Sequence, residues 1–406
     1  MLQTELKLAA LNLSRQRKRT LLSLSAIVIG IAGYLLAGGF IEWIFWAIRE
    51  SAIQTGLGHI QITAAGYRIG GNADPFRFQM PENEALKREI LALSGVRTIA
   101  RRLMVSGMIS SGDVTVPFAG EGVEPSTDKA INGELKLVGR YLSDEDPLGV
   151  LIGRGLAGAL KLKPGDRIAF ITRDDRGGVN GSDAIVRGVF ATEIKAYDDI
   201  AVRFPLRLAQ TLMRTTGVHL WVVGLDDTAR TSEVVEQLRP LLAREGLEQR
   251  SWFDLSDFYR KSVSLLSRQM EVVAILIGLI LILGIANLLM MSTIERTGEI
   301  GTMLALGTGR SVIARMLLME GVLVGVIGAL IGVAIGYLLA LGVSWVGIPM
   351  PPPPGRDTGY RAEILITSGL IAKSVIIAVV SAAAAGLFPA WKASRMVIVD
   401  ALRFNR

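Results

Sequence analysis

Four long stretches of the chain carry no charged residue and consist largely of apolar side chains. They cover residues 21–41, 272–291, 321–348 and 374–391. A helix needs about 20 apolar residues to cross the ~30 Å hydrocarbon core of a bilayer. The fourth stretch is shorter, but it can extend back past Lys373, whose ammonium can reach the interface. The pattern predicts four transmembrane helices, the first too long for the apolar part of a cleaved signal peptide.

The block between the first and second stretches has a different pattern, in which short alternating runs are interleaved with helix-like periods. Leu86, Ile90 and Leu93, for example, fall on one face of a helix predicted over residues 81–93. We expect an extracytoplasmic α/β domain in two lobes, one of residues 50–110 and 215–260 and the other of the middle. The predicted strands lie at 59–63, 114–118, 148–170 (two strands around a helix), 184–190 and 219–223, and a further helix at 231–242.

The fold class predicted for the chain is therefore a membrane protein with four transmembrane α-helices and one large α/β domain between helices one and two. The expected order is a cytoplasmic amphipathic and basic segment (1–20), helix one (21–48), the periplasmic domain (49–270), helix two (271–291), a cytoplasmic coupling segment (292–314), helix three (315–348), a periplasmic loop (349–371), helix four (372–392) and a cytoplasmic tail (393–406).

The distribution of charge predicts the orientation in the membrane. The net charge is +7 and the isoelectric point is about 9.7. The basic excess lies beside the apolar stretches, above all at Arg15, Arg17, Lys18 and Arg19, whereas the large block is nearly neutral. Cytoplasmic loops are enriched in Lys and Arg. We therefore expect both termini in the cytoplasm, contact with membrane lipids, and no binding of nucleic acid.

The residues of the large block do not suggest catalysis or metal binding. The chain has no cysteine and two histidines, His59 and His219, which are far apart in sequence, whereas a zinc site needs several such ligands. The acidic pairs at 174–175, 198–199 and 226–227 are expected in surface turns, and residues 173–181 in an exposed hairpin loop. No catalytic, cofactor-binding or metal-binding residue is predicted.

The segment after the second stretch is short, apolar and patterned, which is unusual for a cytoplasmic loop. Glu295 and Glu299 are one helical turn apart, and the apolar residues between 300 and 306 share a face. An amphipathic helix of this kind is suited to docking into a groove of another protein. The predicted coupling residues are Glu295, Arg296, Glu299, Ile300, Gly301, Met303, Leu304, Ala305, Leu306 and Gly307.

Small residues recur at four-residue spacing in the third stretch, which allows close approach of helix backbones. We expect Gly321, Gly325, Gly328, Gly332 and Gly336 to form tight packing within the four-helix unit. Glu320, just before this stretch, is expected at its cytoplasmic end near Arg315.

Three segments resemble the FtsX-like and MacB-type ABC permease family. Residues 295–307 read ERTGEIGTMLALG, similar to the coupling segment of that family, E-R-x-x-E-I-G-x-x-x-A-L-G. The sequence departs from the usual form at Gly298 and Leu304, so particular salt bridges with a partner do not carry over. The C-terminus resembles the closing pattern of the family at Pro389, Ala390, Ala393, Arg395, Ala401, Leu402 and Arg403. Residues 148–170 resemble the periplasmic core domain of the family.

The resemblance implies a type VII ABC transporter permease of the bacterial inner membrane, nearest in plan to lipoprotein-releasing permeases. Such permeases work as dimers, of identical or related chains, with two copies of an ATP-binding subunit, and some use a periplasmic adaptor. ATP and Mg²⁺ would bind the partner, because this chain contains no Gly-Lys pair and hence no P-loop. We therefore expect a non-enzymatic subunit that binds no cofactor.

The expected function is mechanotransmission, in which ATP hydrolysis by the partner moves the periplasmic domain. The cargo would be a lipoprotein, an amphiphile or a drug. The alternative is a non-transporting signalling scaffold that controls a periplasmic cell-wall hydrolase.

Overall fold

The computed structural model describes residues 17–71, 73–132, 136–192, 195–351, 360–398 and 401. The chain divides into a helical unit and an α/β unit, the latter made mainly of residues 47–261. The predicted amphipathic segment at the N-terminus lies almost wholly outside the described residues, as do Leu402 and Arg403.

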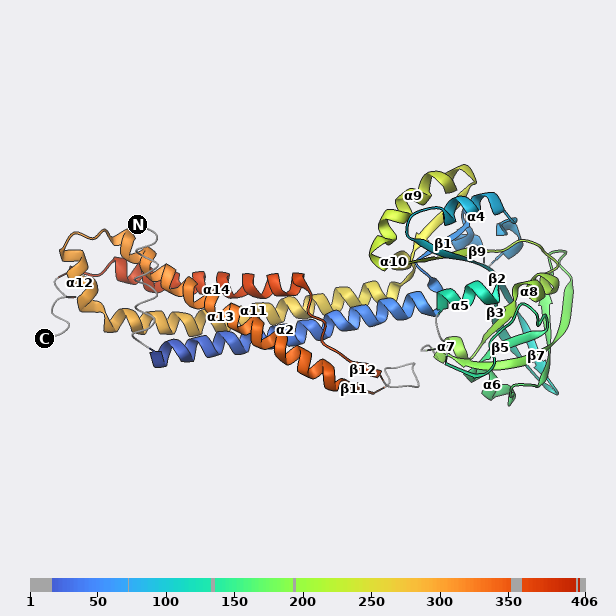
Figure 1. The fold of residues 1–406 in the computed structure, drawn as a ribbon, viewed down its shortest axis with the longest axis horizontal. Coiled ribbons are helices and arrows are strands. Elements are labelled where there is room, and N and C mark those ends of the chain that lie inside the picture. Colours follow the sequence, from blue (N-terminus) through green and yellow to red (C-terminus); the bar gives the residue numbers. More distant parts are fainter. Residues whose placement is uncertain are drawn as a thin grey trace. The chain divides into compact units, whose positions relative to one another are not determined.

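Four long helices form the helical unit, and each contains one of the apolar stretches (Figure 1). All four are long and apolar enough to cross a membrane, which confirms the predicted fold class for this unit. Residues 262–270, assigned above to the α/β domain, instead form part of the second long helix in the helical unit. The helices are α2 (Arg17–Ala52), α11 (Asp257–Glu295), α13 (Arg310–Val346) and α14 (Ser368–Ser394); the short strands β11 (Ile348–Met350) and β12 (Tyr360–Ala362) lie between the last two.

Glycines of α13 face the neighbouring helices. A methyl group on Gly332 would lie 2.9 Å from Cβ of Ile31 on α2, and Gly328 and Gly336 are equally close to the same helix. A methyl group on Gly325 would lie 2.4 Å from Cβ of Ala382 on α14, and Gly321 also faces that helix. Because a side chain at these positions would separate the backbones, the glycines set the close packing of α13.

The α/β unit is built on a ten-stranded sheet. Its strands are β1 (Ile60–Ala64), β2 (Val96–Ser111), β3 (Val114–Val123), β4 (Lys136–Gly139), β5 (Gly149–Gly153), β6 (Arg167–Arg173), β7 (Val179–Ala191), β8 (Ala201–Pro205), β9 (Leu220–Leu225) and β10 (Leu247–Ser251). Its helices are α3 (Tyr67–Gly70), α4 (Glu84–Leu91), α5 (Pro125–Asn132), α6 (Arg154–Leu160), α7 (Lys195–Asp198), α8 (Leu206–Met213), α9 (Thr231–Arg244) and α10 (Trp252–Leu255), with short turns η1 (Ile53–Leu57), η2 (Pro75–Phe78) and η3 (Thr228–Arg230).

The sheet has an open half and a closed half. In the open half the order is β10-β1-β9-β2. In the closed half β2 pairs with β3, and pairing continues through β8, β5, β7 and β6 back to β2, which closes a six-stranded barrel. The rings of Phe118, Phe170 and Phe204 pack together inside this barrel, with centroids 4.7–5.7 Å apart.

The two halves correspond to the two predicted lobes, but they are not independent. Strand β2 pairs with β9 over its first part and with β3 over its second part, so it belongs to both. One hydrophobic core runs through both halves. The long strand explains the difference from the prediction, because the sequence pattern of a strand does not reveal how many partners it has.

Two of the three acidic pairs are not in plain surface turns. Asp174 and Asp198 are buried, and each accepts hydrogen bonds from nearby backbone N–H groups, of Gly178 at 2.7 Å and of Thr192 at 2.9 Å. The predicted hairpin between β6 and β7 does form, but its Asp174 is buried and accepts a hydrogen bond from the Gly178 N–H within the turn. The prediction of exposure was wrong here because a carboxylate can replace a missing backbone partner in a tight turn.

Candidate functional site

The predicted coupling segment forms a separate helix at one end of the helical unit. Glu295 is the last residue of α11, the helix is interrupted at Arg296, and α12 covers Thr297–Ala305. The first four residues of the predicted coupling segment (292–314) therefore belong to α11. Helix α12 is therefore a separate helix, joined to the second span by the single residue Arg296.

Helix α12 ends in a well-defined cap. Gly307 has a φ of +90°, a conformation that favours glycine. The backbone N–H of Thr308 donates to the Met303 carbonyl at 3.0 Å, and that of Gly307 donates to the Leu304 carbonyl at 3.1 Å. This pair of bonds is a Schellman motif, which satisfies the last carbonyls of the helix. The final A-L-G of the segment thus stops the helix and turns the chain toward α13.

One side of α12 is buried within the chain itself. Ile300 is 2% exposed and Leu304 is 8% exposed. The expectation that these two residues offer an apolar face to a partner is therefore wrong. Burying such side chains stabilises the packing by about 1.5–3 kcal/mol each. They form a small core of Ile300, Leu304, Ile313, Leu317, Ala390 and Ala393.

The opposite side of α12 is open. Leu306 is 83% exposed, and Thr302, Ala305 and Gly307 are exposed beside it. Glu295 and Glu299 are also exposed, Met303 is partly buried and Gly301 is buried. The available surface is therefore the C-terminal end of the helix with acidic residues nearer its start.

An ion pair that the sequence analysis missed fixes the break between α11 and α12. Nη1 of Arg296 lies 3.5 Å from Oε2 of Glu320, which is buried in α13. Nε of Arg296 lies 3.3 Å from Oε2 of Glu299. The sequence indicated that Glu320 needs a cation, because it is an acid at the start of an uncharged stretch. Arg315 was predicted as its neighbour because it is closer in sequence than Arg296.

The predicted C-terminal motif meets the coupling helix. Pro389, Ala390 and Ala393 are buried in the last turns of α14, and the two alanines contribute to the small core under α12. Arg395 follows α14 and places its guanidinium 4.9 Å from the centre of the Trp391 ring. Ala401 is buried. The small residues of this motif thus allow α12 to lie close to the end of α14.

The histidines of the α/β unit have structural roles. Nδ1 of His59 accepts from the Leu225 backbone N–H at 3.2 Å, and Nδ1 of His219 accepts from the Met104 N–H at 3.0 Å. Burial lowers the pKa of both, that of His59 to about 4. Among the described residues no group of three His, Asp or Glu side chains is placed to hold a metal ion.

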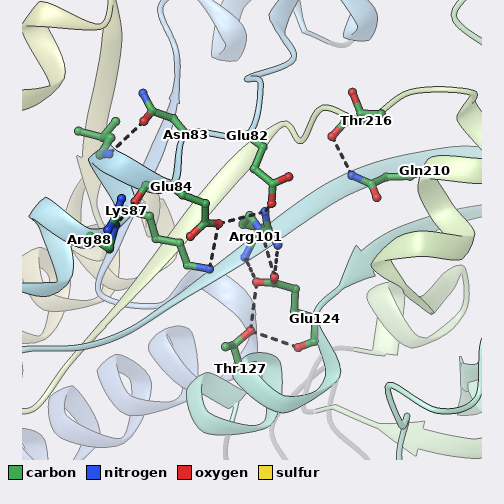
Figure 2. A network of polar contacts seen from close by, with 11 residues as sticks. Glu82, Asn83, Glu84, Lys87, Arg88, Arg101, Glu124, Thr127, Gln210 and Thr216 are labelled. Carbon is green, nitrogen blue, oxygen red and sulfur yellow. Dashed lines mark hydrogen bonds and ion pairs between the residues drawn. The ribbon is translucent and has the colours of Figure 1, made fainter.

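Two adjacent arginines of β2 carry polar networks that the sequence analysis did not single out. Arg101 is partly buried and binds Glu82 and Glu124, with Nε of Arg101 2.9 Å from Oε1 of Glu124 (Figure 2). Arg102 points the other way and is buried, with Nη2 3.0 Å from Oδ1 of Asp128. The sequence could have indicated this, because adjacent residues of a strand point to opposite faces, so two neighbouring arginines must have different surroundings.

Asp128 is the centre of the buried network. Its Oδ2 is 2.9 Å from Nη1 of Arg203 and accepts from the Tyr141 hydroxyl at 2.7 Å. Glu121 lies 3.2 Å from Arg102 and 3.5 Å from the Tyr197 hydroxyl. Burial and the Glu121 carboxylate raise the pKa of Tyr197 to about 12, so this phenol remains a neutral donor.

Comparison with known proteins identifies both parts of the chain. The model of the MacB-like periplasmic core domain matches residues 20–241, and that of the FtsX-like permease C-terminal region matches residues 271–398. The macrolide export ATP-binding/permease protein MacB of Rhodopirellula baltica is 24% identical over 98% of this chain and 62% of its own length. The lipoprotein-releasing system transmembrane protein LolE of Haemophilus influenzae is 24% identical over 62% of this chain and 64% of its own length.

The chain therefore spans less than two thirds of these relatives. The solved periplasmic region of MacB from Actinobacillus actinomycetemcomitans aligns with 52% of this chain and 94% of its own, at 15% identity and a TM-score of 0.38. The first model covers most of α2 and of the α/β unit, up to residue 241, and the second covers most of α11 and the whole of α12, α13 and α14. The chain belongs to the family of proteins with a MacB-like periplasmic core domain, and its C-terminal part, residues 271–398, matches the FtsX-like permease C-terminal region.

Proposed function

We propose that this chain is the permease subunit of an ABC transporter, and that it couples ATP hydrolysis by a separate ATP-binding subunit to movement of its α/β unit. The subunit itself binds no nucleotide in this proposal. It acts in the bacterial inner membrane, with both termini and α12 in the cytoplasm and the α/β unit in the periplasm.

The observation that carries the proposal is the two-sided environment of α12. Its buried side, through Ile300 and Leu304, packs against residues of α13 and α14. Its other side leaves Leu306 open to a partner. A partner that binds the open side and moves will displace α12 together with the ends of two spans, because a packed core transmits displacement rather than absorbing it.

Displacement then passes along the helices. Arg296 connects α12 to the end of α11 and, through Glu320, to α13. Helices α2 and α11 are continuous, and both run from the helical unit into the α/β unit. Movement of these helices would therefore reach the periplasm without a solute pore between them.

The cargo in this proposal is a lipoprotein, an amphiphile or a drug presented outside the bilayer. The names of the relatives, a macrolide exporter and a lipoprotein-releasing protein, support these classes. The working unit is a dimer of permeases with two ATP-binding subunits, and a periplasmic adaptor or acceptor would receive the cargo.

The test is affinity purification of the tagged chain from native membranes, followed by mass spectrometry. We expect an ATP-binding subunit in stoichiometric amount, and reconstituted vesicles should release a fluorescent amphiphile or a lipoprotein only with ATP. Reproducible absence of an ATP-binding subunit, under conditions that preserve other ABC complexes, would overturn the proposal. Partner binding and ATP hydrolysis without release of any cargo would instead favour the signalling scaffold.

A further inference from the structure

Arg102 lies at the point where the two halves of the α/β unit meet. Along β2 it pairs with Leu220 of β9, on the open side, and with Val123 of β3, in the barrel. Among the described residues, those of β2 before Arg102 pair with β9, and those after it pair with the barrel strands β3 and β6. Its position is therefore the junction of the shared strand.

The side chain of Arg102 connects this junction to the end of the first long helix. After α2 the chain makes the short π-helical turn η1, within which Gly56 has a φ of +130°. Nη1 of Arg102 donates to the Gly56 carbonyl at 2.6 Å. Gly56 lies in η1, beyond the last residue of α2, and its backbone is not helical. The guanidinium of Arg102 thus binds the turn that directly follows the helix containing the first span.

The glycine at this contact is required by the geometry. A φ of +130° is rarely adopted by residues with a side chain, and a methyl group on Gly56 would lie 3.2 Å from Nη1 of Arg102. Turns of the π type are frequent at functional sites. Replacement of Gly56 would therefore move the carbonyl that Arg102 binds.

The rest of the network holds the guanidinium in place from the barrel side. Asp128 of α5 binds both Arg102 and Arg203 of β8, and it is 0% exposed. Removing such charges from water costs several kcal/mol per ion, and apolar residues of similar volume often stabilise a core at least as well. Stability alone thus does not explain three charged side chains at this place. A directional hydrogen bond does explain them, because it connects the Gly56 carbonyl to the residue of β2 that pairs with both β9 and β3.

We propose that Arg102 is a positioning residue that delivers movement of the first span to the junction between the two halves of the α/β unit. Pulling or rotating the end of α2 acts on β2 at its shared residue, so the open half and the barrel change their relative orientation. This inference rests on the proposed function, and it adds the residue through which the movement enters the periplasmic unit.

The test uses the full chain with its ATP-binding subunit in lipid nanodiscs. Because the chain has no cysteine, Arg239→Cys on α9 and Val179→Cys at the start of β7 place one spin label on each half, both at well-exposed positions. Pulsed electron paramagnetic resonance spectroscopy measures the distance between the two spin labels with and without trapped ATP. We expect ATP to change this distance in the parent protein, and Arg102→Gln to reduce the change to less than half while ATP hydrolysis stays within twofold.

Arg101→Gln is the matched control, since it removes the neighbouring arginine, whose ion pairs are with Glu82, Glu84 and Glu124 instead of Asp128 (Figure 2). It should leave the ATP-dependent change intact. If Arg102→Gln does not fold, Gly56→Ala tests the same contact from the other side, with Gly112→Ala, a positive-φ glycine with open space around it, as its control. A full ATP-dependent change in a folded Arg102→Gln or Gly56→Ala protein would overturn the inference. No change with ATP in the parent protein would instead overturn the proposed function.

Discussion

The backbone N–H of Trp252 donates a hydrogen bond to the carbonyl of His59 at 2.9 Å, although the two residues stand near opposite ends of the α/β unit in sequence. His59 follows the turn that ends the first long helix, and Trp252 begins α10, which leads into α11. The adjacent strands β1 and β10 pair from Ile60 and Ser251 onward. The segment that follows α2 and the segment that precedes α11 therefore meet at one place in the α/β unit.

The two sides of α12 should respond differently to the same substitution. Leu306→Asp adds a charge to an open position, so we expect folding stability to change by less than about 0.5 kcal/mol. Stimulation of the partner's ATP hydrolysis should fall at least tenfold, because the charge lies on the proposed docking surface. Ile300→Asp buries a carboxylate without a partner and should destabilise the helical unit by roughly 3 kcal/mol or more.

Thermal unfolding of the purified chain and ATP hydrolysis of the complex measure the two effects separately. The assignment of the two sides would be contradicted if Leu306→Asp unfolded the chain or coupled normally.

Arg296 and Glu320 should behave as a coupled pair. Arg296→Gln leaves the buried carboxylate of Glu320 without its cation, whereas the double variant Arg296→Gln/Glu320→Gln removes both charges. We expect the double variant to be more stable than the sum of the single effects predicts, with a coupling energy of about 1–3 kcal/mol. Reversible unfolding in mixed micelles provides the four free energies. Additive effects would show that the two residues act independently.

The glycine contacts of α13 should matter only where a neighbouring helix is close. Gly332→Ala places a methyl group 2.9 Å from Cβ of Ile31, and such overpacking typically costs about 1–3 kcal/mol. Gly342→Ala, on the same helix, meets no atom within 4 Å and should be neutral or slightly stabilising. Melting temperatures in detergent compare the two, and equal losses would argue against close packing at Gly332.

Acid should destabilise the α/β unit through its histidines. Burial and, to a smaller extent, the positive charge of Arg97 together lower the pKa of His59 from 6.5 to about 4, against the opposing effect of Asp227. The unfolded chain therefore binds a proton more readily, and the stability contributed by neutral His59 is present above about pH 6.5 and lost as the pH falls toward 4. His219 acts in the same direction.

His59→Gln keeps a donor and an acceptor but does not titrate, so the melting temperature of this variant should fall less between pH 6.5 and 4 than that of the parent. An identical pH dependence would show that His59 is not responsible.

The sequence predicts most of this architecture because the bilayer imposes a strict rule. An uncharged run long enough to cross the hydrocarbon core is a strong signal, and all four such runs are helices in the structure. Within the α/β unit, the unit of residues 148–170 appears as β5, α6 and β6 because alternation and turn residues agree locally. These features depend on neighbours in sequence.

What could not be predicted depends on neighbours in space. The pattern shows that Ile300 and Leu304 share a helix face, but not that Ala390, far along the chain, covers that face. It shows two arginines in β2, but not that Gly56 presents a carbonyl to one of them. Likewise, the sequence around Asp174 and Asp198 is typical of turns, but only the folded turns show the backbone N–H groups that donate hydrogen bonds to their buried carboxylates.

The most direct test of the proposed coupling is cross-linking from Leu306, which directly follows α12 and is 83% exposed. Leu306→Cys in this cysteine-free chain accepts a short photoactivatable reagent, and Leu338→Cys, exposed in the C-terminal half of α13, is the control. After irradiation of native membranes, the account predicts a product of Leu306→Cys with an ATP-binding subunit whose yield changes when ATP is trapped, and no such product from Leu338→Cys. Cross-linking of Leu306→Cys only to lipid or to other proteins, with a functional complex present, would contradict it.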